Sequence, residues 1–135
     1  MDHKGVWILA EQSNGRVLRI SHELLTRGRE LADKRGTDLT AVIFGHNADL
    51  RELIDRGADK VIATEAPRLE RFLVEPYAAC MRKLIEEHRP EIIIAGATST
   101  GRTLMPYLAI KVSAGLTADC TVLDIEKDTG NLLQT

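Results

Sequence analysis

The segment most able to do chemistry is the loop from Gly96 to Arg102, which follows the apolar run Ile92–Ala95. Its glycines allow a ligand to approach the backbone closely, its threonine and serine hydroxyls can donate hydrogen bonds, and its arginine adds a positive charge. A turn of this kind between a strand and a helix can hold phosphate through backbone N–H groups and the helix dipole. The candidate cofactor-binding residues are Gly96, Ala97, Thr98, Ser99, Gly101 and Arg102.

The same loop can equally be a strand-to-helix turn of small residues, with Thr100 as the helix N-cap. It also differs from a P-loop, because Arg102 stands where that motif requires a lysine that reaches the terminal phosphates. A P-loop enzyme further needs a later strand ending in a metal-binding aspartate. Only one later strand is expected, flanked by Asp119 and Asp124. The sequence therefore disfavours an NTPase.

The polar stretch Glu11–Gly15 follows the first apolar run and should lie at the same edge of the sheet as the Gly96–Arg102 loop. It contains no G-x-G-x-x-G, so the dinucleotide fingerprint is absent. The stretch could contact a nucleotide or a neighbouring domain, but a solvated loop is the simpler interpretation.

No catalytic or metal-binding set stands out among the other polar residues. The four histidines have no partners at a useful spacing, and the two cysteines fit neither a metal motif nor a redox pair. We therefore expect no catalytic residues and no metal, and we expect Cys80 and Trp7 to belong to the core. The residues concerned are His3, His22, His46, His88, Cys80 and Cys120.

Composition narrows the class of protein further. The chain has 135 residues, with 18 Lys and Arg against 20 Asp and Glu, and only 4% aromatic residues. This length favours one domain, and the near-neutral charge and scarce aromatics disfavour nucleic-acid binding. No apolar run approaches the roughly 20 residues of a membrane helix, and no signal peptide is evident. We therefore expect a cytoplasmic protein without membrane insertion.

Short apolar runs alternate with helical patterns along the chain. This order predicts an α/β three-layer sandwich around a mainly parallel five-stranded sheet. The last strand alternates apolar and polar residues, which suggests an exposed face or a sheet edge. Gly36 should cap the first helix, and Pro106 fits only near the first turn of the last one. The predicted strands are Val6–Ala10, Leu39–Phe44, Val61–Ala63, Ile92–Ala95 and Cys120–Ile125.

Of two further segments, one suggests a contact with another protein and the other bears on the extent of the chain. The stretch Arg68–Glu75 mixes charge with Leu69, Phe72 and Leu73, which makes it a candidate docking surface. Asp128–Asn131 is typical of a hairpin turn, and the hairpin's second strand has only begun at Thr135. We therefore expect that the chain is cut from something longer.

Across its whole length the chain resembles the N-terminal domain of the electron transfer flavoprotein alpha subunit. The resemblance implies an adenine-nucleotide alpha-hydrolase-like fold over residues 1–135, with a C-terminal FAD-binding domain that would follow. The residues that carry it are Val6–Glu11, Gly57–Val61, Gly96–Arg102 and Gly115–Cys120.

The resemblance implies a scaffold rather than an enzyme. The family forms a heterodimer with a beta subunit and carries electrons on FAD from dehydrogenases, such as the acyl-CoA dehydrogenase of fatty acid beta-oxidation, to the respiratory chain. FAD is held mainly by the C-terminal domain, so none is expected in these residues. The Gly96–Arg102 loop corresponds to the beta subunit's nucleotide loop but lacks its acidic run.

Two alternatives remain open from the sequence. One is a stand-alone AMP- or ATP-binding module of the universal-stress type, which the fold and the Gly96–Arg102 loop suggest. The other is a pure interaction protein.

Overall fold

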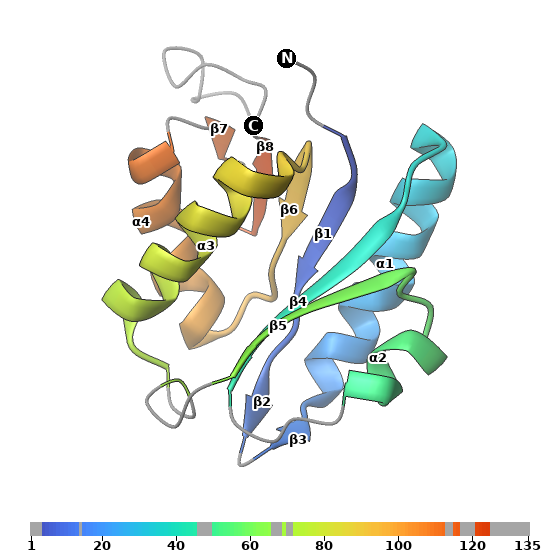
Figure 1. Ribbon diagram of the computed structural model, residues 1–135, viewed down its shortest axis with the longest axis horizontal. Coiled ribbons are helices and arrows are strands. Elements are labelled where there is room, and N and C mark those ends of the chain that lie inside the picture. Colours follow the sequence, from blue (N-terminus) through green and yellow to red (C-terminus); the bar gives the residue numbers. More distant parts are fainter. Residues whose placement is uncertain are drawn as a thin grey trace.

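A computed structural model of the chain describes residues 4–13, 15–45, 50–65, 69, 72–112, 115–116 and 121–124. Strands and helices alternate in these residues, and helices cover both faces of one twisted sheet (Figure 1). The elements are β1(Val6–Leu9), β2(Gln12–Ser13), β3(Arg16–Val17), α1(Arg19–Arg35), β4(Leu39–Gly45), α2(Leu50–Asp55), β5(Lys60–Glu65), α3(Val74–His88), β6(Ile92–Ile94), α4(Ser99–Val112), β7(Gly115–Leu116) and β8(Val122–Asp124).

The main sheet has six strands in the order β5-β4-β1-β6-β8-β7. Strands β5, β4, β1 and β6 are parallel, whereas β8 runs antiparallel to both β6 and β7. The predicted mainly parallel α/β sandwich is confirmed, but the sheet has six strands rather than the expected five. Periodicity does not encode strand direction, and the two residues of β7 are too few to show a pattern. Strand β8 is not the edge either, since β7 lies outside it.

The sheet separates two apolar layers, because alternate residues of a strand point to opposite faces. Along β1, Val6 and Ile8 pack in one layer with α1 and α2, while Trp7 and Leu9 pack in the other with α3 and α4. All four side chains are at most 3% exposed. Strand β1 is therefore the central strand that the continuous apolar run predicts.

The helix ends follow the sequence signals except in α4. Gly36 takes a left-handed conformation after α1, with φ of 64°, and its N–H bonds to carbonyls of the last turn. Pro90 lies two residues after α3, a position where proline is common because it cannot continue a helix. Pro106, however, lies inside α4, so the expectation that it belongs to the first turn is wrong. Packing of α4 against the core outweighs the missing N–H at that position.

Residues 12–17 contain a short hairpin rather than only the solvated loop expected from the sequence. Strands β2 and β3 pair antiparallel, which Figure 1 shows below the carboxyl end of β1. The Gln12 amide fixes the hairpin, because its Nε2 donates to the Phe44 carbonyl at 3.2 Å and its Oε1 accepts from the Gly15 N–H at 2.8 Å. The hairpin is thereby fastened over the end of β4.

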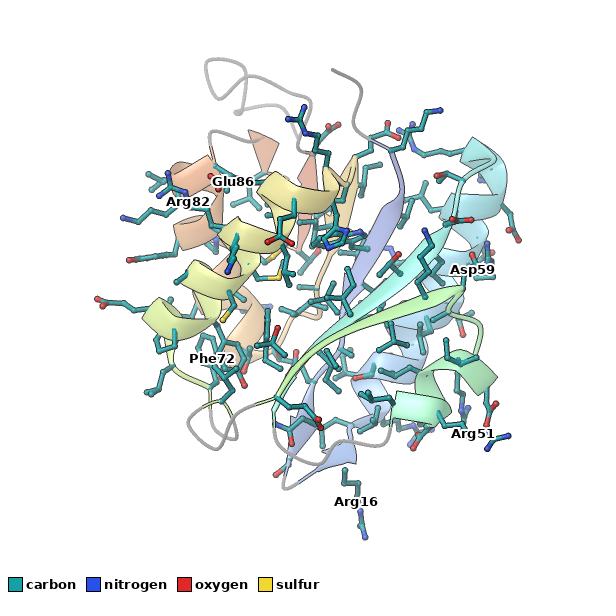
Figure 2. The ribbon with its side chains drawn as sticks, in the orientation of Figure 1. Arg16, Arg51, Asp59, Phe72, Arg82 and Glu86 are labelled. Carbon is teal, nitrogen blue, oxygen red and sulfur yellow. The ribbon has the colours of Figure 1, made fainter. Side chains whose placement is uncertain are left out.

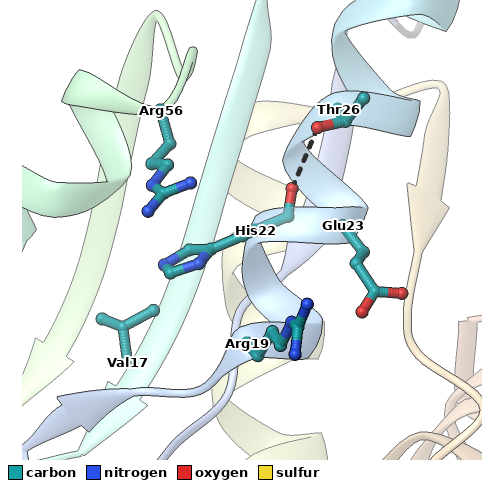
Figure 3. Close-up of a pocket in the computed structure, with 6 residues that line it drawn as sticks. All are labelled: Val17, Arg19, His22, Glu23, Thr26 and Arg56. Atoms are coloured by element: carbon teal, nitrogen blue, oxygen red, sulfur yellow. Dashed lines mark hydrogen bonds between the residues drawn. The ribbon is translucent and has the colours of Figure 1, made fainter.

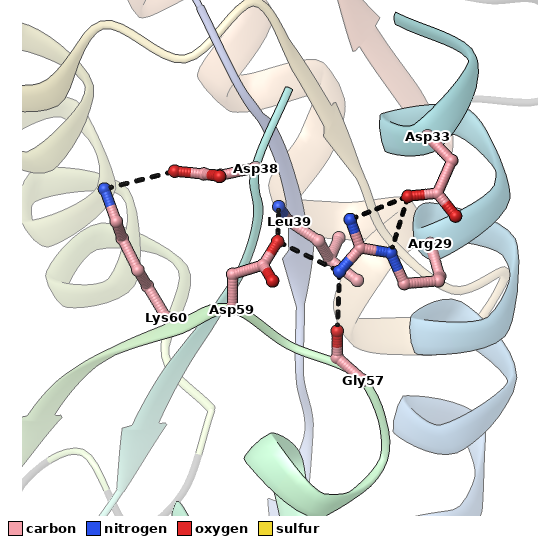
Figure 4. A network of polar contacts seen from close by, with 7 residues as sticks. All are labelled: Arg29, Asp33, Asp38, Leu39, Gly57, Asp59 and Lys60. Carbon is pink, nitrogen blue, oxygen red and sulfur yellow. Dashed lines mark hydrogen bonds and ion pairs between the residues drawn. The ribbon is translucent and has the colours of Figure 1, made fainter. Parts of the chain in front are cut away.

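A polar network holds α1 against the starts of β4 and β5 (Figure 4). The Arg29 guanidinium donates to the Asp59 carboxylate at 2.9 Å and to the Gly57 carbonyl at 3.0 Å. Asp59 also accepts the Leu39 N–H at 2.9 Å. That backbone bond, followed by the Arg29 contact, holds the pKa of Asp59 below its ordinary value. Arg29, Asp59 and the backbone groups of Gly57 and Leu39 thus form a structural contact, which we call the Asp59 clamp. Within the Gly57–Val61 segment, Gly57 and Asp59 take part in it.

Several single-residue expectations can be checked in the same way. Trp7 is 3% exposed, as predicted, and Cys80 packs half-buried against the core. In α2, Leu53 is buried whereas Ile54 is exposed. His3, His46, Cys120 and the turn Asp128–Asn131 lie outside the described residues. Among the described helices, none combines the length and apolarity needed to span a membrane.

Candidate functional site at the carboxyl edge of the sheet

The site lies where the strand order reverses. From β1 the chain first builds the sheet on one side through β4 and β5, and then returns to the other side of β1 as β6. Ligands of open α/β sheets bind at such a switch point, outside the carboxyl ends of the strands. Here two side chains span the point: the Thr98 hydroxyl, after β6, donates to the Glu11 carboxylate, after β1, at 2.6 Å.

Thr98 also begins α4. Its Oγ1 accepts the N–H of Gly101, three residues further on, at 3.1 Å, which is the geometry of an N-cap. The prediction that Thr100 is the cap is therefore wrong, because the helix begins one residue earlier, at Ser99. Glu11 places a negative charge near the positive end of α4, which stabilises the helix.

The two glycines of the loop are explained by packing within the chain. A Cβ on Gly101 would lie 2.0 Å from the Gly96 carbonyl oxygen, and a Cβ on Gly96 would lie 2.6 Å from Cγ1 of Ile20. Both glycines are buried. In the structure these glycines allow the loop to pack closely against α1 and against its own backbone at the start of α4.

The remaining predicted residues do not converge on one point. Ala97, Ser99 and Arg102 are exposed, while Thr98 is half-buried against Glu11. A phosphate at this turn would meet the Glu11 carboxylate, and like charges at close range repel strongly. The turn therefore carries a carboxylate beside its backbone N–H groups.

Beside this contact is a crevice of about 310 Å³, which we call the Glu11 crevice. Apolar and aromatic side chains form most of its wall, and polar groups of the β1 end and the hairpin form its rim. Phe44 and Tyr77 have ring centroids 5.0 Å apart, and Phe72 and Tyr77 also lie 5.0 Å apart. Its lining residues are Leu9, Ala10, Glu11, Gln12, Ser13, Leu18, Phe44, Phe72, Tyr77 and Thr100.

The pKa of Tyr77 depends on its burial in the crevice wall and on the charge of Glu11. Its hydroxyl donates to the Leu69 carbonyl at 2.8 Å in a buried position. Burial raises the pKa of the Tyr77 phenol, and the nearby Glu11 charge raises it further, since a second negative charge disfavours the phenolate.

Two hydrogen bonds with Ser21 fix the backbone of Glu11. Its backbone N–H donates to the Ser21 hydroxyl at 2.8 Å, and that hydroxyl donates to the Glu11 carbonyl at 3.0 Å. Ser21, in the first turn of α1, is fully buried. The roles of Ser21, Gln12 and Tyr77 were not predicted from the sequence. Only Glu11 had a usable signal, namely an acid directly after a continuous apolar strand.

A second hollow, of about 560 Å³, lies between α1 and α2 (Figure 3). Arg19, His22 and Arg56 line it together with Glu23, so its charge is mixed. His22 is bonded to Glu52 of α2, and the Thr26 hydroxyl donates to the His22 carbonyl at 3.2 Å. In the part of the chain that is described, no group of histidines, cysteines and acids could hold a metal ion.

The strand order and the crevice define an open α/β domain with a crevice beside its switch point. Comparison with protein families agrees with this class. The electron transfer flavoprotein domain matches residues 6–135, and the chain belongs to that family.

Similar proteins include the electron transfer flavoprotein subunit alpha of Clostridium acetobutylicum, 46% identical over 99% of this chain and 40% of the relative. The acryloyl-CoA reductase electron transfer subunit beta of Anaerotignum propionicum is 40% identical over 91% of this chain and 34% of the relative. The lactate dehydrogenase (NAD(+),ferredoxin) subunit LctC of Acetobacterium woodii is 36% identical over 94% and 31%. The chain thus spans about two-fifths or less of these relatives.

Proposed function

We propose that this chain is the N-terminal domain of an electron transfer flavoprotein alpha-type subunit, in which it acts as a scaffold. In this role the domain pairs with a beta subunit and supports the part of the protein that holds FAD. The observation that carries the proposal is the family match over residues 6–135. The printed names of the relatives, which call them subunits, support a multi-chain assembly.

The described site supports a role without chemistry of its own. The Glu11–Thr98 hydrogen bond joins the two chain segments that meet at the switch point. The crevice beside it has an aromatic wall and one carboxylate, a set suited to contact rather than to proton transfer or redox chemistry.

The described loop does not fit the pyrophosphate of FAD, because the Glu11 carboxylate lies at the turn and Gly101 packs on the Gly96 carbonyl. We therefore place FAD in the longer part of the subunit, where it would supply the redox chemistry. The electron donors in this proposal are dehydrogenases, for example acyl-CoA dehydrogenases, the acceptor is the respiratory chain, and the location is cytoplasmic.

The test has two measurements on purified protein. The 135-residue chain is mixed with FAD and followed by flavin fluorescence, and it is co-expressed with an electron transfer flavoprotein beta subunit and examined by size-exclusion chromatography. We expect a stable two-chain complex and no stoichiometric flavin on the chain alone. Tight flavin binding by the chain alone, or a persistent monomer beside the beta subunit, would contradict the proposal.

The AMP- or ATP-binding module is the competing function. Calorimetry with AMP and ATP separates the two proposals, because a nucleotide module should bind at micromolar concentration and lose that binding in Gly101→Asp. We expect no binding of either nucleotide, because a carboxylate lies at the turn.

A further inference from the structure

We infer that the Glu11 crevice is a docking site for an arginine side chain of a second subunit. The inference rests on the proposed function, since it names the contact through which that subunit would be recognised. The sequence suggested a negatively charged phosphate at this edge of the sheet, whereas the crevice suits a positively charged guanidinium.

The carboxylate of Glu11 is only partly used within the chain. Oε2 accepts the Thr98 hydroxyl, while Oε1 has no hydrogen-bond or ion-pair partner among the described residues. The bonds from Ser21 to the Glu11 backbone hold the residue in place. A fixed, half-buried carboxylate with a free oxygen is a strong acceptor for a guanidinium, because charge-assisted hydrogen bonds are roughly twice as strong as neutral ones.

The wall of the crevice suits the same group. Rings of Phe44, Phe72 and Tyr77 contribute to it, and Phe72 lies at the approach to α3 in Figure 2. A guanidinium stacks on aromatic faces and is weakly hydrated, so it enters an apolar crevice at less cost than an ammonium. A carboxylate at one end and aromatic rings along the wall therefore favour arginine over lysine.

The residue that follows the wall residue Phe72 indicates a protein as the source of the arginine. Leu73 follows Phe72 and is 56% exposed, although it is a large apolar residue. These residues belong to the Arg68–Glu75 stretch, whose composition alone suggested a docking surface. An exposed apolar side chain beside an aromatic pocket is typical of protein interfaces.

A separate chain is the occupant to which we commit. Relatives of this chain are named as subunits. In addition, β8 is antiparallel to β6, with Val122 opposite Ile94 and Asp124 opposite Ile92. The last described strand therefore runs away from the carboxyl edge, where the crevice lies, toward the opposite edge.

The first arm of the test examines the chemistry of the crevice in the 135-residue chain. Amide resonances near Glu11 are followed by NMR during titration with Nα-acetyl-arginine amide, its uncharged citrulline analogue, and AMP. We expect saturable shifts at Gln12, Thr98 and Gly101 with the arginine compound only. Glu11→Gln should weaken this binding at least about tenfold, which corresponds to about 1.4 kcal/mol, while the matched control Glu30→Gln should leave it unchanged.

Glu11→Gln retains an oxygen that accepts the Thr98 hydroxyl, so it should keep the fold, and circular dichroism verifies this. Glu11→Asp, which keeps the charge, should retain part of the arginine binding. Equal binding of arginine and citrulline compounds, or equal binding to wild type and Glu11→Gln, overturns the inference. The same holds if AMP shifts these amides and arginine does not.

The second arm uses the beta subunit. Its affinity for wild type, Glu11→Gln and Glu30→Gln is measured by calorimetry, and we expect a loss of at least about tenfold for Glu11→Gln alone. If the beta subunit binds all three equally, the docking inference fails and the proposed function stands. If it binds none of them, the proposed function fails, and docking to that subunit fails with it, while the NMR arm still decides what the crevice accepts.

Discussion

Thr98 and Glu11 lie 87 positions apart in sequence, yet the Thr98 hydroxyl donates to the Glu11 carboxylate at 2.6 Å and closes the switch point of the sheet. Because Thr98 also accepts the Gly101 N–H, one short chain of hydrogen bonds links the start of α4 to the end of β1. Hydrogen bonds in such chains polarise and strengthen one another.

Replacing Thr98 by valine should destabilise the fold by about 1–2 kcal/mol, because the variant loses an N-cap and one partner of a carboxylate. Urea unfolding followed by circular dichroism measures the change. Thr103→Val, at an exposed position of the same helix, is the matched control and should stay within roughly 0.5 kcal/mol. Equal effects of the two substitutions would show that the hydrogen-bond chain contributes nothing.

Gly101→Ala should destabilise the protein although alanine favours helices by about 1 kcal/mol over glycine. The new Cβ would lie 2.0 Å from a backbone oxygen, that of Gly96, which cannot turn aside as a side chain can. Gly28→Ala is the control within a helix, because its closest contacts are side-chain methyl groups, Cδ1 of Leu39 at 2.7 Å and Cγ2 of Ile8 at 2.8 Å, rather than backbone atoms. Thermal unfolding should show the larger loss for Gly101→Ala, and the reverse order would contradict the packing argument.

The Asp59 clamp should make stability depend on acidity. Its pKa is lowered in the folded protein by the Leu39 N–H and then by Arg29, so its stabilisation is complete above the unfolded pKa, about 4, and is lost as pH falls through the folded value. Asp59→Asn should cost roughly 1 kcal/mol near neutral pH, a figure reduced for solvent screening because the side chain is 42% exposed. The difference from wild type should shrink below about pH 4.

Asp33→Asn supplies the comparison for this clamp. Asp33 also contacts Arg29, at 3.0 Å, but its side chain is 66% exposed. Its substitution should therefore change the free energy of unfolding by less than about 0.5 kcal/mol at every pH. A pH-independent difference for Asp59→Asn would mean that its charge is not what stabilises the clamp.

Ionisation of Tyr77 should report the charge of the crevice. In a Tyr107→Phe background Tyr77 is the only remaining tyrosine, since the chain has two, and absorbance at alkaline pH follows its phenol. Its pKa should lie above the ordinary value of 10.0 because of burial first and Glu11 second. Glu11→Gln should lower that pKa without abolishing the shift, and Glu30→Gln should not change it. An unchanged Tyr77 pKa in Glu11→Gln would show that the Glu11 charge does not act on the phenol in the crevice wall.

The local elements were predictable because their signals are local. Continuous apolar runs gave β1, β4 and β6, and Gly36 gave the end of α1. The direction of β8, the two-residue strand β7 and the β2–β3 hairpin were not predictable in this way. Short strands carry too few residues for a period, and direction depends on connections rather than on alternation.

The candidate site was predictable only in its location. The Gly96–Arg102 loop does lie at the carboxyl edge, but its glycines are required by Ile20 and by the loop's own carbonyl. Neither contact can be inferred from the loop sequence. The contact of Gly96 with Ile20 joins residues more than 70 positions apart, and the contact of Gly101 with the Gly96 carbonyl depends on how α4 begins. The same holds for Ser21, whose hydroxyl is buried against Glu11.

Because the core is divided into two layers, the fluorescence of one tryptophan can report on one layer and not on the other. Trp7 is the single tryptophan, and it belongs to the layer with α3 and α4, where its ring lies 6.1 Å from that of His88. Its emission therefore reports on that layer, whereas circular dichroism reports on the helices of both. Coincident transitions from the two signals would mean that the layers unfold as one cooperative unit, and an earlier loss of helix signal would identify the side with α1 and α2 as the part that opens first.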